Sequence, residues 1–156
     1  MRKAERQNYN GAAQLRLCWT GQMPITVGWD DDAKTIIRWN YSGPWTISEF
    51  HRQRYQEQQL RAEVDHRIDC IIDVHAIHML PKSVSSLFKT VAFETTEYHQ
   101  NSALTVVVGA NTVMRVWYEV FKHLYPEQAR RYRFVAQLED AYTTIAEARA
   151  PEKSDT

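Results

Sequence analysis

The stretch that most constrains the fold runs from residue 68 to residue 88. It begins with an almost continuous apolar run from Ile68 to Val74, which carries the acid Asp73 near its end. Such a run is typical of a strand that is buried on both faces, as in a parallel sheet. A loop follows, and after Pro81 apolar residues recur at helical spacing. The stretch therefore predicts a buried strand, a turn and a crossover helix.

The same alternation of strand and helix continues toward the C-terminus. Residues 104–108 form a second fully apolar run, and apolar residues recur at helical spacing on both sides of the short strand that we expect at residues 133–135. The predicted elements after the first buried strand are a helix over about 83–99, a strand at 104–108, a helix that is capped by Asn111 or Thr112 and stopped by Pro126, a strand at 133–135 and a helix over 138–148.

The N-terminal half predicts a hairpin and one helix. Apolar residues alternate over 25–29 and over 37–41, with a short polar loop between them, which indicates two antiparallel strands. Thr46 precedes Glu49 by three residues, the spacing of a capping box, so a helix is expected to begin there. The middle of this helix is polar almost all round, and we expect it to lie exposed along one edge. The order ββαβαβαβα predicts an α/β fold: an antiparallel hairpin that leads into a mostly parallel sheet with right-handed crossovers.

Length and charge narrow the classes of function. The chain has 156 residues, which suits one domain with a real core. Basic and acidic residues both number 19, so the formal net charge is zero. Because a neutral chain has no overall field that attracts nucleic acid, we expect no nucleic-acid partner. No apolar run approaches the ~20 residues that a membrane span needs, so we expect a cytoplasmic protein.

We expect one domain over residues 23–150, preceded by a mostly disordered extension at residues 1–22 and followed by a frayed tail at residues 151–156. Met23 stands just before the first clear strand, so a translation start there rather than at Met1 is an alternative. The sequence contains two cysteines, and Cys70 lies in the most apolar strand. We therefore expect Cys70 to be a buried thiol rather than half of a bridge.

Four segments resemble the SpoIIAA-like (STAS) domains, including their uncharacterised bacterial single-domain members. They are ITVGWDDDAKTIIRWNYSGPWT, IIDVHAIHMLP, LTVVVGANT and RRYRFVAQLEDAYTTI, and together they extend over about residues 24–149. The resemblance implies a sheet whose parallel strands advance in a right-handed βα superhelix. It also implies a non-enzymatic role in regulation or protein contact.

The resemblance also draws attention to Ser83. In the anti-sigma-factor antagonists of this family, an Asp-Ser-Ser-Gly turn opens the helix after the third strand, and a serine of that turn is phosphorylated. The corresponding place here runs from Met79 to Ser83 and lacks this turn. Ser83 is the serine nearest to that place, so it is the candidate phosphorylation site.

Candidate binding residues lie where the parallel strands end. Ligands of open α/β sheets favour this rim, where helix N-termini also attract anions. Asp73, His75 and His78 lie close in sequence, but loop spacing does not give them a shared direction and no distant third ligand is evident, so we expect no metal. A serine nucleophile would need a Gly-x-Ser-x-Gly elbow, which is absent. The rim candidates are Trp45, Asp73, His75, His78, Ser83, Asn111 and Thr112.

The aromatic residues around the hairpin allow two interpretations. Trp29, Trp39 and Trp45 either line an apolar pocket or partner surface, or belong to the core. Alternation places Trp29 and Trp39 on one face of the hairpin, which favours the core for these two. Trp45 stands where the first helix begins, so it is the better candidate for exposure.

Three functional hypotheses follow from these patterns. The first is a non-catalytic, STAS-like regulatory or interaction domain that binds a protein partner or a second copy of itself, without a cofactor. The second is a carrier of a small molecule or lipid, with a pocket formed by the aromatic hairpin and the first three helices. The third is an enzyme that uses Asp73 and His75 at the strand-end rim.

Overall fold

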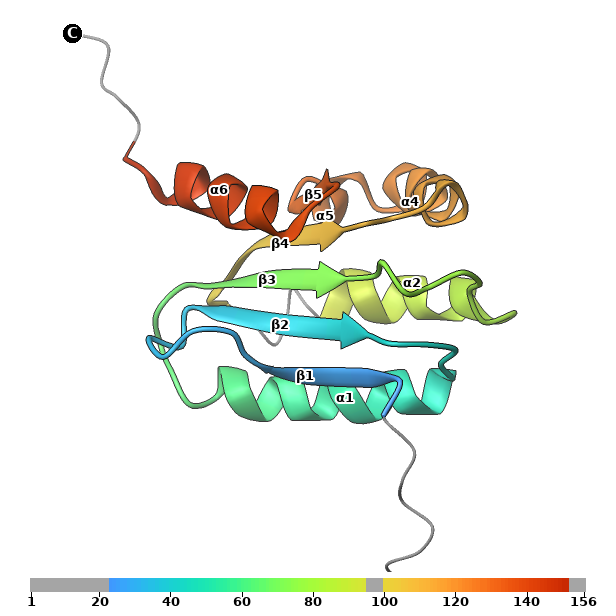
Figure 1. Ribbon diagram of the computed structural model, residues 1–156, viewed down its shortest axis with the longest axis horizontal. Helices are drawn as coiled ribbons and strands as arrows, with labels where there is room; N and C mark the ends of the chain where they lie inside the picture. Colours follow the sequence, from blue (N-terminus) through green and yellow to red (C-terminus); the bar gives the residue numbers. More distant parts are fainter. Residues whose placement is uncertain (1–22, 95–99, 152–156) are drawn as a thin grey trace, which may run out of the picture.

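The computed structural model describes residues 23–94 and 100–151, which form an α/β domain around a five-stranded sheet (Figure 1). The strand order is β1-β2-β3-β4-β5; β1 and β2 are antiparallel, and the other neighbours are parallel. The predicted α/β class, with a hairpin that leads into a parallel sheet, is confirmed. The predicted extension at residues 1–22 lies outside the described residues. The strands are β1 (Ile25–Trp29), β2 (Ile36–Tyr41), β3 (Ile68–Asp73), β4 (Ser102–Val108) and β5 (Tyr132–Val135).

The longer helices begin where the sequence predicts. Thr46 caps α1, because its hydroxyl accepts the Glu49 N–H at 3.2 Å while the Glu49 carboxylate accepts the Thr46 N–H at 2.7 Å. Asn111 caps α4. Pro126 ends α4 but also begins the short helix α5, which the sequence analysis missed; proline fits a first helical position because the N–H that it lacks has no helical partner there. The helices are α1 (Ile47–Arg61), α4 (Thr112–Leu124), α5 (Pro126–Ala129) and α6 (Leu138–Arg149).

The helix predicted over residues 83–99 is wrong as a single regular element. Three short helical segments take its place: the 3₁₀ turn η2 (Val84–Ser86), α2 (Leu87–Lys89) and the π-helical turn η3 (Thr90–Glu94). The Ser86 hydroxyl donates to the Ser83 carbonyl at 2.6 Å, and side-chain bonds of this kind compete with regular helix formation. Residues 95–99 lie outside the described part of the chain.

Each face of the sheet has its own core. Val107 of β4 belongs to the core on the face that α1 and α2 cover, whereas Val106 and Val108 belong to the core beneath α6. Figure 1 shows α1 along β1 and α6 beside β4. Ile71 of β3 is fully buried, and Cys70 on the same strand is a buried free thiol, as predicted. The central strands are therefore covered on both faces.

The prediction that α1 lies exposed holds for only one of its faces, because the opposite polar face is buried against the sheet. Arg54, Glu57 and Arg61 are 7%, 2% and 4% exposed. Glu57 accepts hydrogen bonds from both arginines, with closest distances of 2.7 Å to each guanidinium. A carboxylate between two guanidiniums offsets part of the desolvation cost of all three groups, which is how a polar helix face becomes buried.

Candidate functional site

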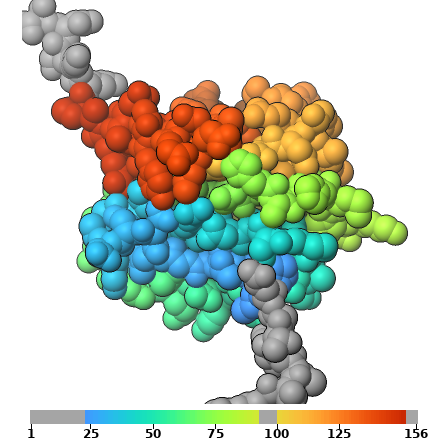
Figure 2. All heavy atoms as spheres, in the orientation of Figure 1, coloured from blue at the N-terminus to red at the C-terminus, as the bar shows by residue number. Residues whose placement is uncertain are grey.

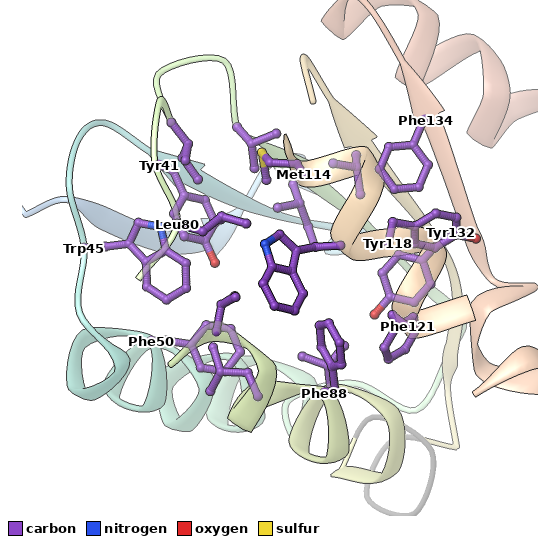
Figure 3. A pocket seen from close by; sticks show the side chains of 18 residues that line it. Tyr41, Trp45, Phe50, Leu80, Phe88, Met114, Tyr118, Phe121, Tyr132 and Phe134 are labelled. Carbon is purple, nitrogen blue, oxygen red and sulfur yellow. The ribbon is translucent and has the colours of Figure 1, made fainter. Parts of the chain in front are cut away.

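An apolar cavity of about 200 Å³ lies between the sheet and the helices that cover its first face (Figure 3). Its walls come from β2, β3, β4 and β5, from α1, from the loop and short helical segments after β3, and from α4. The lining is almost wholly apolar and rich in aromatic rings. It comprises Tyr41, Trp45, Phe50, Ile72, Val74, Ile77, Leu80, Val84, Leu87, Phe88, Val91, Val107, Met114, Trp117, Tyr118, Phe121, Tyr132 and Phe134.

Two groups of packed aromatic rings shape the cavity. Trp45 packs against Tyr41 with ring centroids 5.4 Å apart and against Phe50 at 6.1 Å. Phe88 packs edge to face on Trp117 and on Phe121, both at 5.7 Å. Figure 3 shows the group around Trp45 on one side of the cavity and Phe121, Tyr132 and Phe134 on the other. Aromatic pairs at these separations pack favourably and contribute to the walls of the cavity.

The tryptophans are placed differently from one another. Trp39 is only 3% exposed, which confirms its assignment to the core, and Trp29 is half-buried against that core. Trp45, which the sequence analysis favours for exposure, is half-buried and lines the cavity. Its indole Nε1 is buried and has no hydrogen-bond partner within the described residues. Trp45 is therefore the one predicted rim residue that belongs to the cavity.

A second, smaller cavity of about 50 Å³, called here the inner chamber, adjoins the first. The two share the wall residues Tyr41, Phe50, Ile72, Val91 and Tyr132. The inner chamber differs in chemistry, because the remaining wall residues include the buried charged residues of α1. These remaining residues are Trp39, Arg54, Glu57, Arg61, Cys70 and Thr105.

Asp73 and His75 contact each other at the end of β3, on the rim that the sequence predicts. His75 Nδ1 lies 2.9 Å from Asp73 Oδ1, and His75 Nε2 lies 2.9 Å from the carbonyl oxygen of Ala136. Arg38 Nη2 donates to the other Asp73 oxygen at 3.1 Å. Gly109 makes room for the imidazole, since a Cβ there would overlap the His75 ring. Both ring nitrogens of His75 therefore face acceptors.

The contacts of His75 and Asp73 shift both of their pKa values. The hydrogen bond to Asp73 raises the pKa of His75 above 6.5, and the Ala136 carbonyl supports the same charged form. Partial burial raises the pKa of Asp73, but the hydrogen bonds from His75 and Arg38 outweigh it and bring that pKa below 3.8. Through these contacts His75 links Asp73 of β3 to the segment after β5, and both contacts favour the charged form of the imidazole.

We expect His75 to stabilise the fold in a pH-dependent way. A histidine whose pKa is raised by folding contributes its full stabilisation at pH values below its unfolded pKa, which is near 6.5. This contribution is lost as the pH rises through the pKa of the folded state. The difference in unfolding free energy between wild type and His75→Ala should therefore shrink as pH rises above 6.5. Urea titrations over this range measure it, with His78→Ala on the same exposed loop as the control. A difference that stays constant with pH would contradict stabilisation by the charged form of His75.

The other predicted rim residues do not form one site. Asn111 has a structural role, because its side chain caps α4 and donates to the Ile77 carbonyl at 3.0 Å. His78, Ser83 and Thr112 are exposed. Figure 2 shows the loop that follows β3, in green, between α4 in orange and the segment after β2. This loop is tied to α4 by Asn111 and brings Ile77 and Leu80 into the cavity wall.

The sequence analysis missed most of the cavity residues. The apolar residues at helical spacing on α4 form a stripe that is not buried as a whole, since Val113, Val116, Val120 and Leu124 are between 42% and 59% exposed. The stripe comprises Val113, Val116, Trp117, Val120, Phe121 and Leu124. Trp117 and Phe121 of the same stripe face the interior, together with Met114, which the stripe omits. In the sequence, only the large size and aromatic character of such residues point to a pocket. The same features are expected of a packed core, so they do not distinguish the two.

Residues 23–94 and 100–151 contain neither a metal-binding cluster of side chains nor a membrane-spanning helix. Within them, no three His, Cys, Asp or Glu side chains gather closely enough to hold a metal ion. No helix in these ranges has the length and apolar content to cross a membrane.

No family model matches the sequence, and no curated protein matches it either. The resemblance to the SpoIIAA-like domains stays a prediction.

Proposed function

We propose that this protein binds a small apolar molecule in the aromatic cavity, as the carrier hypothesis expects. The observation that carries the proposal is an apolar pocket of about 200 Å³ that is lined by aromatic rings and partly open at the surface. Apolar surface that faces water is unfavourable, so a small apolar molecule that covers these walls would bind favourably. An apolar cavity with a few polar groups at its border is the usual form of a small-molecule site.

The experiment adds a side chain to the cavity wall. Met114 lines the cavity, and Met114→Trp should fill part of it and weaken the binding of n-octanol at least tenfold. Met79→Trp is the matched control, because Met79 is 81% exposed and does not line the cavity. Saturation-transfer NMR on purified protein measures the binding of n-octanol. Equal binding by both variants, or no binding by wild type, would refute the proposal.

Self-association is a second candidate function, favoured by the exposed stripe on α4. Val113, Val116 and Val120 follow one another at spacings of three and four residues, as in a helix that packs along another helix. A second copy of the chain is the occupant that we propose, since the formal net charge of zero does not oppose association of two copies. Light scattering should then give twice the chain mass of 18.3 kDa at high concentration. The monomer mass at every concentration would exclude this candidate.

A further inference from the structure

The inner chamber contains hydrogen-bonding groups that lack partners. Tyr41 and Tyr132 line both cavities, and neither hydroxyl has a hydrogen-bond partner among the described residues. Burial raises the pKa of both hydroxyls, so both stay protonated and can donate. Tyr132 nonetheless has some accessible surface, as expected of a side chain that borders two cavities.

Arg61 provides an independent observation in the same wall. It is 4% exposed, and its Nε and Nη2 donate to Glu57 Oε1 at 2.9 and 2.7 Å. Its Nη1 is buried and has no hydrogen-bond partner in the described part of the chain. More than nine in ten buried polar groups in proteins are hydrogen-bonded, so a guanidinium with an unused donor indicates that an acceptor belongs nearby.

Arg61 and the two tyrosine hydroxyls can all donate hydrogen bonds. An arginine can only donate, and a protonated tyrosine hydroxyl donates to any acceptor beside it. The one carboxylate of the chamber wall, Glu57, already accepts from two guanidiniums. A ligand group that suits this chamber therefore accepts several hydrogen bonds, and a negative charge on it would strengthen those that Arg61 gives.

We propose that the ligand is an amphipathic carboxylic acid whose apolar chain fills the larger cavity and whose carboxylate lies in the inner chamber. This inference rests on the proposed function and adds the chemical class of the ligand. The shared wall of Tyr41 and Tyr132 is where chain and carboxylate would meet. An apolar cavity of ~150 Å³ holds benzene, so a chain of about six to ten carbons suits the volume observed here.

The test compares two ligands that share a chain and differ in the end group, n-octanoate and n-octanol. Wild type should bind octanoate at least tenfold more tightly, as hydrogen bonds to charged groups predict. Arg61→Met should remove most of this preference and leave octanol binding within twofold of wild type. Arg130→Met, at an arginine whose side chain is 75% exposed, is the matched control and should change neither affinity. Saturation-transfer NMR and displacement titrations give both dissociation constants.

A second pair of variants covers the case in which Arg61→Met does not fold. Tyr41→Phe and Tyr132→Phe each remove one hydroxyl and little else, and each should weaken octanoate several-fold more than octanol. Equal affinity of wild type for the two ligands would overturn the carboxylate assignment while leaving the apolar site intact. A preference for octanoate that neither Arg61 nor the tyrosines affect would overturn it as well, because the carboxylate would then lie elsewhere. Failure of both ligands to bind would instead refute the proposed function.

Discussion

Val107→Asp is expected to leave the chain unfolded. Val107 is 7% exposed in the middle of the sheet, on the face that α1 and α2 cover. An aspartate there places a carboxylate against apolar side chains, with no cation among its cavity neighbours. An unpaired buried charge costs several kcal/mol, which is comparable to the ~5–15 kcal/mol that stabilises a whole domain. Circular dichroism and amide NMR dispersion measure the outcome.

The control places the same substitution on the surface. Val113 is 50% exposed in the first turn of α4, where a negative charge is favourable near the helix N-terminus. Val113→Asp should therefore fold and change the unfolding free energy by no more than about 0.5 kcal/mol. A soluble Val107→Asp variant that melts cooperatively at the wild-type temperature would show that the assignment of β4 to the core is wrong.

Glu57→Gln is expected to destabilise the domain by roughly 3–5 kcal/mol, the range measured when one partner of a buried ion pair is removed. Both Glu57 oxygens accept hydrogen bonds from buried guanidiniums. The glutamine amide keeps the shape and one acceptor but loses the negative charge. Arg54 and Arg61 would then be two buried cations without the carboxylate that lies between them. Urea denaturation at neutral pH gives the change in unfolding free energy.

The matched control for Glu57 is another glutamate on a helix. Glu119 forms an ion pair with Lys122 at 3.5 Å, and both side chains are more than half exposed. Exposed pairs of this kind contribute at most about 1 kcal/mol, so Glu119→Gln should be nearly neutral. If the two substitutions have equal effects, the buried cluster of α1 is not the stabilising unit that its geometry indicates.

The sequence predicted those features that depend on short stretches of chain. The alternation of residues 25–29 and 37–41 gave the hairpin, and the apolar run from Ile68 gave the central strand. The capping box of Thr46 and Glu49 gave the start of α1. Each of these rests on periodicity or on a hydrogen bond between residues three apart, so the information is local and can be read directly.

The candidate site could be predicted only in part. The contact of Asp73 with His75 follows from their closeness in sequence, but the Ala136 carbonyl that binds the other ring nitrogen is 61 residues away. Trp45 was singled out by its position before the first helix. Its place in a cavity wall depends on residues of other segments, such as Phe50 and Leu80, which line the same cavity.

The sequence by itself determined the α/β class, the order of the five strands, and the starts of α1 and α4. Only the tertiary structure decided that one polar face of α1 is buried, that four of the six residues of the apolar stripe of α4 are exposed, and that aromatic rings line a cavity. The physical reason is that burial is a property of the surfaces that meet. Arg61 is buried because Glu57 and the sheet surround it, and the cavity exists because the side chains of several elements do not fill the space between them.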